Sequence, residues 1–206
     1  QTQISPSMYE SVKEGKILTV KGGSTIADGI AVKTPGKITY ELVKKYVDEL
    51  VLVTEGEISS AILTLLEENK IITEGAAAST VAALMYKKFS HKGKKVCCVL
   101  SGGNIDVTRV SKVIEKGLYK TNRRMELRIN LNDQPGQISR VSEILEKEGA
   151  NIVQIGQNID LVGDTIDSMI VSVVIDTKGK DHQDQILTAL NQHAYVYKAR
   201  YNDAQF

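Results

Sequence analysis

A serine followed by two glycines and an asparagine, Ser101-Gly102-Gly103-Asn104, has the composition of a ligand-binding turn. It follows the apolar run 96–100, which predicts a strand buried on both faces of a parallel sheet. Open α/β sheets bind their ligands at the carboxyl ends of such strands. Glycines let the backbone approach a ligand closely, and a serine hydroxyl can donate and accept hydrogen bonds. The turn is therefore a candidate binding site, although a plain Gly-Gly connector fits the same residues.

Two further segments contain residues that could contact a ligand. The glycine-rich stretch 22–29 ends in Gly29, but it is equally compatible with a helix start capped by Ser24 or Thr25. Glu74 precedes an alanine-rich helix, and a carboxylate is favourable in a first helical turn without any function. Neither segment identifies a site by itself.

The cysteines and histidines predict neither a disulfide nor a metal centre. Cys97 and Cys98 are adjacent, and neighbours on a strand point to opposite faces, so we expect two buried small hydrophobic residues. The histidines lack the spacing of metal ligands. They are His91, His182 and His193.

Composition and charge limit the classes of protein to which this chain can belong. The 206 residues are 42% hydrophobic and 25% charged, as in soluble globular proteins, and suffice for one large or two small domains. The net charge of +1 gives no electrostatic reason to expect nucleic acid or an anionic membrane as a partner. The longest stretch without a charge, 75–86, is too short to cross a bilayer. Residues 1–9 lack the pattern of a signal peptide, so we expect a cytoplasmic protein.

Hydrophobic periodicity divides the chain into two domains of different architecture. The first, 1–118, alternates helices with apolar strands and is predicted to be α/β, with helices at 38–50, 55–69, 74–89 and 107–117 and strands at 50–53 and 96–100. A polar linker, 119–123, precedes the second domain, 124–206. Its pattern predicts a ferredoxin-like βαββαβ fold, with strands at 125–131, 151–160, 168–176 and 194–200 and helices at 138–148 and 181–192.

Several segments in a fixed order resemble the second half of the threonine and serine dehydratases. They are residues 23–29, 40–43, 51–58, 73–77 and 100–106. The resemblance covers residues 1 to about 118 and implies a pyridoxal-phosphate (PLP) enzyme of fold type II, the three-layer α/β fold of tryptophan synthase β; serine racemase is a close relative. Residues 124–201 resemble an ACT regulatory domain, as in the medium-length threonine ammonia-lyases that carry one at the C-terminus.

The resemblance implies roles for the candidate residues. The Ser101 hydroxyl would meet the pyridine nitrogen of PLP, and Gly102, Gly103 and Asn104 would form the adjoining pocket wall. Gly29 and Glu74 match positions close to the cofactor ring. A neutral hydroxyl partner makes the ring a weaker electron sink than a carboxylate partner would, which suits β-elimination.

Two motifs of the family are missing from this sequence. The family's Schiff-base lysine lies in a Ser-Phe-Lys-x-Arg-Gly motif, and neither this motif nor the glycine-rich phosphate loop occurs here. Lys13 and Lys92 each follow a serine by two places, but both stretches read as solvent-exposed surface. The chain therefore looks like the C-terminal half of an enzyme, contains no catalytic residue of its own and is expected to be inactive alone. Gln1 and Ser7 replace the carboxylates of the serine racemase metal site, so we expect no metal.

The second domain contains a candidate effector loop between its first strand and first helix. Free N–H groups at such a helix start can hold a carboxylate, and the resemblance implies that ACT domains bind amino acids at this loop, usually across an interface with a second ACT domain. A plain Pro-Gly turn fits the sequence equally well. Gly156 on the next strand could leave room for the ligand. The loop residues are Asn132, Asp133, Gln134, Pro135, Gly136, Gln137 and Ile138.

The expected activity of the parent enzyme is deamination of L-threonine to 2-oxobutanoate and ammonia, with L-serine as a side substrate and with a small-molecule effector, whose identity the sequence leaves open, acting through the ACT domain. We expect a homo-oligomer, a dimer or tetramer, or an association with the missing N-terminal half. Two alternatives are a non-catalytic regulatory chain that binds amino acids, and a serine racemase or serine dehydratase.

Overall fold

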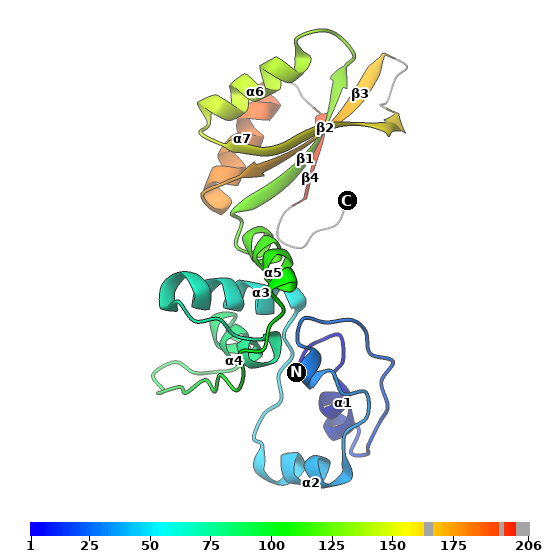
Figure 1. Cartoon of the computed structure of the whole chain (residues 1–206), viewed down its shortest axis with the longest axis vertical. Helices are drawn as coiled ribbons and strands as arrows, with labels where there is room; N and C mark the ends of the chain where they lie inside the picture. The colour runs from blue at the N-terminus through cyan, green and yellow to red at the C-terminus, as the bar shows by residue number, and fades with distance from the viewer. Residues whose placement is uncertain (163–166, 194–195, 201–206) are drawn as a thin grey trace. The chain divides into compact units, whose positions relative to one another are not determined.

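The computed structural model describes residues 1–162, 167–193 and 196–200. The chain divides into two compact units, Gln1–Gly117 and Leu118–Phe206, and each is described by itself (Figure 1). Within the described ranges, no helix is both long enough and apolar enough to span a membrane.

The first unit is mainly helical in the described residues. The helices expected from the 3.6-residue period are confirmed, although α2 and α4 end earlier than predicted and α5 continues into the expected linker. A short helix at residues 7–13 was not predicted. The elements are α1 (Ser7–Lys13), the 3₁₀ turn η1 (Asp28–Ile30), α2 (Lys37–Tyr46), α3 (Glu55–Thr64), its π-helical continuation η2 (Leu65–Asn69), α4 (Gly75–Met85) and α5 (Val107–Lys120).

The core of the first unit lies where α3 packs against α4. Ala61 on α3 and Ala78 and Ala82 on α4 are fully buried, and their small side chains allow the two helices to approach closely. Gly117 on α5 also packs against α3, because a methyl group there would lie 3.0 Å from the Ser59 carbonyl oxygen. Small residues at the contact positions thus determine how these helices pack.

The strand predicted at residues 50–53 is reduced to one parallel bridge, between Thr2 and Val53. The Gln3 amide donates to the Val53 carbonyl at 2.9 Å, and the Val53 amide donates to the Gln1 carbonyl at 3.0 Å. Two short extended segments therefore pair, but this bridge does not extend into a ladder.

The strand predicted at residues 96–100 does not form, and the expectation that it is buried on both faces is wrong. Val99 is 66% exposed, Cys97 is exposed and Cys98 is half-buried, so the prediction of two buried cysteines is also wrong. A central strand is buried by neighbouring strands. Among the described residues, no backbone–backbone hydrogen bond joins 96–100 to another segment, and the Thr80 hydroxyl donates to the Val99 carbonyl at 3.4 Å.

A capping box begins α3. The Thr54 hydroxyl accepts from the Glu57 amide at 3.2 Å, and the Glu57 carboxylate accepts from the Thr54 amide at 2.9 Å. The other carboxylate oxygen of Glu57 lies 2.7 Å from the Lys88 ammonium. The box therefore satisfies two amides at the start of the helix that forms the core.

We expect Thr54→Ala to lower the free energy of unfolding of the first unit by about 1 kcal/mol, because it removes the acceptor for the Glu57 amide. Urea denaturation monitored by circular dichroism measures this change. Thr54→Ser keeps the hydroxyl and is the matched control. Equal stability of the Ala and Ser variants would show that the box does not stabilise α3.

The second unit is a four-stranded antiparallel sheet in the order β2-β3-β1-β4. Buried and half-buried residues alternate along β1 and β3, and α6 and α7 cover one face of the sheet (Figure 1). The predicted ferredoxin-like order is confirmed. Residues 163–166, between the strands predicted at 151–160 and 168–176, and residues 194–195, at the start of the last predicted strand, fall outside the described residues. The elements are β1 (Arg124–Asn132), α6 (Gln137–Lys147), β2 (Asn151–Val162), β3 (Ser168–Asp176), α7 (Lys180–Gln192) and β4 (Val196–Arg200).

Candidate functional site

The glycine turn after residue 100 and the start of α4 lie against each other. The Gly102 carbonyl accepts hydrogen bonds from the Glu74 amide at 3.2 Å and the Thr73 hydroxyl at 2.9 Å. A methyl group on Gly102 would lie 2.6 Å from a Glu74 carboxylate oxygen. Only glycine fits at this position without moving Glu74, so the structure brings together two of the candidate residues.

Gly29 also lies near the Glu74 carboxylate. A methyl group on Gly29 would lie 3.3 Å from the Ala76 side chain and 3.8 Å from a Glu74 carboxylate oxygen. The Gly29 backbone therefore lies close to the first turn of α4. Three candidates from distant parts of the sequence, Gly29, Glu74 and Gly102, thus form one cluster.

The loop that contains Gly29 is held by Glu55, which sequence reasoning missed. One Glu55 carboxylate oxygen accepts from the hydroxyls of Thr25 and Thr2, and the other accepts from the Ile26 amide at 2.9 Å. Thr25 is buried and bonds to Glu55, and η1 begins only at Asp28, so the alternative of a helix cap at Ser24 or Thr25 is wrong. A glutamate in a first helical turn is favourable simply because its charge interacts with the helix dipole, so the sequence alone did not single out Glu55.

Ser101 is exposed, and its hydroxyl has no hydrogen bond to any other described residue. Gly103 and Asn104 are also exposed. A methyl group on Gly103 would lie 3.2 Å from the Ile72 carbonyl oxygen, so the turn lies close to the segment before α4. The hydroxyl of Ser101 is available to a ligand at the surface of the first unit.

A hollow of about 320 Å³ adjoins this cluster. Glu74 and Asn104 line it, whereas Ser101, Gly102 and Gly29 do not. An ion pair between Arg109 and Asp28, at 3.0 Å, lies on its wall. Both partners are more than half exposed, so the pair contributes little stability. The other lining residues are Ile26, Gly75, Ile105, Asp106 and Val113.

Asp106 directly precedes α5 at the edge of this hollow. Its carboxylate accepts from the Thr108 amide at 2.8 Å and from the Thr108 hydroxyl at 2.9 Å, and these bonds, with a smaller contribution from the Arg109 charge, lower the pKa of Asp106 below its ordinary value. A carboxyl group whose pKa is lower in the folded chain than in the unfolded chain stabilises the fold at pH values above its unfolded pKa, near 3.8. This stabilisation is lost as the pH falls through the pKa of the folded chain.

We expect Asp106→Asn to be less stable than the parent chain at pH 7, by a small amount because the site is exposed, and to match the parent below the folded pKa of Asp106. Asparagine also caps a helix N-terminus well, so a difference in stability between the two chains reports the charge of Asp106. Urea denaturation at pH 7 and at successively lower pH values measures it. A difference that stays constant across this pH range would contradict the assignment.

Lys13 and Lys92 are both exposed, as predicted. The Gln1 amide oxygen accepts from the Tyr9 amide at 2.8 Å, and the Ser7 hydroxyl donates to the Val32 carbonyl. In the part of the chain that the structure describes, no group of three or more His, Cys, Asp and Glu side chains could hold a metal ion.

The predicted effector loop is an exposed turn at the start of α6. The Asp133 amide donates to the Asp167 carbonyl and the Gln134 amide to the Asn132 carbonyl, each at 2.8 Å. Gly136 has φ of 89°, a left-handed conformation that favours glycine. Of the seven loop residues, Gln137 alone is half-buried and the rest are exposed. Gly156 on β2 has open space where a side chain would begin.

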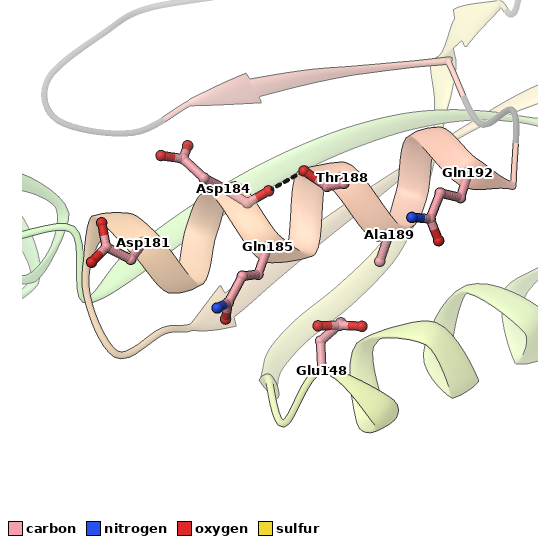
Figure 2. A pocket seen from close by; sticks show the side chains of 7 residues that line it. All are labelled: Glu148, Asp181, Asp184, Gln185, Thr188, Ala189 and Gln192. Atoms are coloured by element: carbon pink, nitrogen blue, oxygen red, sulfur yellow. Dashed lines mark hydrogen bonds between the residues drawn. The ribbon is translucent and has the colours of Figure 1, made fainter.

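A hollow in the second unit lies away from this loop, beside α7 and the far end of α6. Its volume is about 490 Å³, and Figure 2 shows the side chains that line it, with the Thr188 hydroxyl donating to the Asp184 carbonyl at 2.8 Å. Three carboxylates and no basic residue line it, which disfavours the carboxylate of an amino acid. The lining residues are Glu148, Asp181, Asp184, Gln185, Thr188, Ala189 and Gln192.

Two family sequence models match this chain. One is described as "Pyridoxal-phosphate dependent enzyme" and covers residues 1–102, and the other is the ACT domain and covers residues 125–194. The two ranges correspond to the two different architectures described above.

Curated relatives match almost the whole chain. An L-threonine ammonia-lyase of Thermotoga maritima is 42% identical over 95% of this chain and 48% of its own length, and one of Geobacter sulfurreducens is 38% identical over 95% and 49%. The chain therefore spans about half the length of these relatives. Among solved structures, the processed form of threonine deaminase isoform 2 from Solanum lycopersicum has a TM-score of 0.50 and 28% identity, over 56% of this chain and 34% of that one.

Proposed function

This chain belongs to the family of pyridoxal-phosphate dependent enzymes and carries an ACT domain, and on that premise we propose that it supplies the C-terminal part of a threonine ammonia-lyase. The reaction would convert L-threonine to 2-oxobutanoate and ammonia, with L-serine as a side substrate. We also propose residues 1–118 as the catalytic part, 119–123 as a linker and 124–206 as the ACT domain; the matched ranges and the two compact units support these bounds.

The exposed Ser101 hydroxyl is the observation that carries this proposal. It is unbonded among the described residues, and it lies next to Gly102, whose backbone closely approaches Glu74. A planar aromatic ring could lie against a wall of glycine backbone with this hydroxyl at its edge, so the residues present fit the cofactor. When bound, PLP supplies an electron sink for the substrate's α-carbon.

The chain's own groups would orient the cofactor and exclude water. Ser101 would bond to the ring nitrogen without a full charge, and Gly102, Gly103 and Asn104 would form the wall beside the ring. Gly29 and Glu74 would also lie close to the ring, and Glu55 fixes the loop that contains Gly29 through its bonds to Thr25 and Ile26.

Catalysis needs residues that this chain does not supply. The Schiff-base lysine motif and the glycine-rich phosphate loop do not occur in its sequence, and the relatives are about twice as long. The activity is therefore proposed for the complete enzyme, and the chain alone is expected to be inactive. Because the lysine motif and the phosphate loop are missing, a non-catalytic regulatory role remains an alternative for the chain alone.

For the ACT domain we propose an amino-acid effector that binds at the loop Asn132–Ile138 and shifts the activity of the first domain. The exposed turn, the left-handed Gly136 and the start of α6 support this location. An oligomer would bring two such loops together, and we propose a dimer or tetramer for the complete enzyme.

The test joins this chain to the part of the Thermotoga maritima L-threonine ammonia-lyase that the match leaves uncovered. The fusion should release 2-oxobutanoate from L-threonine in the presence of PLP, and the Ser101→Ala fusion should be about 100-fold less active. This chain alone, treated with PLP and borohydride, should show no adduct specific to one lysine by mass spectrometry. A folded fusion without deaminase activity, or a specific lysine adduct on this chain alone, would overturn the proposal.

A further inference from the structure

The Glu55 carboxylate joins three segments of the first unit that are far apart in the sequence. It lies in the first turn of α3, and one of its oxygens accepts hydrogen bonds from the Thr2 hydroxyl at 3.3 Å and from the Thr25 hydroxyl. The other oxygen accepts from the Ile26 amide at 2.9 Å. Thr2 and Thr25 are buried and Glu55 is half-buried, so these bonds are partly shielded from water. Hydrogen bonds to a carboxylate are among the stronger ones in proteins, and Glu55 therefore holds these segments together.

The directions of these hydrogen bonds require an acceptor at both oxygens of Glu55. The Ala27 amide donates to the Thr25 hydroxyl oxygen at 3.1 Å, and the Ile4 amide donates to the Thr2 hydroxyl oxygen at 3.4 Å. Each hydroxyl thus accepts from a backbone amide and gives its single proton to Glu55. The third contact of Glu55 also comes from an N–H group. A carboxylate meets this requirement because it only accepts, whereas a side-chain amide presents a donor on one side.

The loop segment that Glu55 holds lies directly against the start of α4. A methyl group on Gly75 would lie 2.2 Å from the Ile26 carbonyl oxygen, so the two backbones touch. Gly75 is the first residue of α4 and directly follows Glu74. Ile26, Glu74 and Gly75 also line the same hollow. Ile26 therefore contacts Glu55 through its amide and the start of α4 through its carbonyl group.

We propose that Glu55 is a positioning residue for the cofactor site, where it fixes the places of Glu74 and Gly29 by holding Ile26. This inference rests on the proposed function. Glu55 acts through the backbone of the loop, because Ile26 packs on the residue that follows Glu74, and Gly29 lies three residues further along the same loop. The contacts continue to the glycine wall, since the Glu74 amide donates to the Gly102 carbonyl at 3.2 Å. Groups that contact a ligand hold it precisely only when the residues behind them are themselves fixed.

Glu55→Gln keeps the size of the side chain and removes one acceptor. If the glutamine NH₂ group faces the Ile26 amide, two donors oppose each other, and if it faces Thr2 and Thr25, their hydroxyls lose their acceptor. Either orientation leaves a donor unpaired, so the loop should loosen. Hydrogen exchange of the full chain measures this, and the amides of Ile26 and Ala27 should exchange about tenfold faster than in the parent.

Glu57→Gln is the matched control for the charge at the start of α3. Glu57 lies in the same first turn, so its substitution removes a similar interaction with the helix dipole, but its side chain contacts Thr54 and Lys88 instead of the loop. Exchange of the Ile26 amide should match the parent in this variant. Equal acceleration in both variants, or in neither, would show that Glu55 contributes only to the stability of α3 and would overturn the proposal.

Glu55→Asp keeps the test decisive if Glu55→Gln does not fold. It retains the negative charge that is favourable at the start of α3, and its carboxylate is one methylene group shorter, so it cannot reach the loop in the same way. The chain should keep its circular dichroism spectrum, while the Ile26 amide exchanges about tenfold faster than in the parent. A folded Asp variant with unchanged exchange at Ile26 would contradict the positioning role.

The effect on the cofactor site is measured in the fusion with the uncovered part of the Thermotoga maritima L-threonine ammonia-lyase. Glu55→Gln should weaken PLP binding about tenfold, followed by the absorbance of the bound cofactor, and should lower kcat/KM for L-threonine about tenfold, whereas Glu57→Gln should match the parent in both. Unchanged PLP affinity and kcat/KM in Glu55→Gln would overturn the positioning role, even if the loop exchanges faster.

PLP affinity separates this inference from the proposed function, because it does not depend on turnover of L-threonine. A parent fusion that binds PLP without deaminating L-threonine contradicts the proposed function, while the affinities of the Glu55 and Glu57 variants still decide the role of Glu55. A folded parent fusion that does not bind PLP overturns both.

Discussion

Gly75→Ala should destabilise the first unit by about 3 kcal/mol, although alanine is the better helix former. The added methyl group would lie 2.2 Å from the Ile26 carbonyl oxygen and 2.9 Å from the Ala27 amide nitrogen. Both are backbone atoms of the loop that Glu55 fixes, so neither can move away cheaply. Steric overlap with rigid backbone therefore outweighs the gain in helix propensity, which is about 1 kcal/mol.

Urea denaturation measures this loss, and hydrogen exchange of α3 and α4 assigns it to the first unit. Gly156→Ala is the matched control, because it adds the same methyl group where no atom lies within 4 Å. The second unit should keep its stability in the Gly75 variant. A Gly75→Ala chain as stable as the parent would show that Ile26 and the start of α4 are not packed as described.

Gly102→Ala should have the opposite profile, with little loss of stability and a large loss of activity. Its methyl group would overlap the Glu74 carboxylate, which is the end of a flexible side chain, so Glu74 can rotate away at a cost of less than about 1 kcal/mol. The wall beside the proposed cofactor ring would nevertheless be displaced. In the fusion enzyme, kcat/KM for L-threonine should fall about 100-fold, as expected when a positioned group moves by about an ångström.

Steady-state kinetics and urea denaturation of the same preparation separate these two effects. Gly36→Ala is a suitable comparison, since a methyl group there would contact only the Thr39 hydroxyl, at 3.2 Å, at the exposed start of α2. The role of the glycine wall would be contradicted if Gly102→Ala retained full activity, or if its activity fell only in proportion to unfolded protein.

Sequence patterns predicted the second unit better than the first, for a physical reason. In β1, alternation of buried residues such as Met125, Leu127 and Ile129 reflects a sheet whose partner strands all lie in the same unit. Residues 96–100 carry an equally clear apolar pattern, but apolarity specifies burial only when a partner is present. The pattern therefore predicted a buried strand that this chain alone does not form.

At the candidate site, too, the sequence predicted individual residues but not the contacts between distant segments. The glycines and Glu74 could be proposed from residue type and order, and the structure clusters Gly29, Glu74 and Gly102. The bonds from Thr25 and Ile26 to Glu55 span about thirty residues and have no local signature. Periodicity and motif order thus indicate elements and candidate residues, whereas the interactions that fix a loop come from tertiary packing.

The pairing of β1 to β4 within a single unit has a consequence for how this protein could have been assembled during evolution. Each of the four strands finds its neighbours inside one compact unit. A module of this kind can be excised, expressed or joined to an unrelated gene without leaving a sheet incomplete. A module with such autonomy can be acquired or lost in one recombination event.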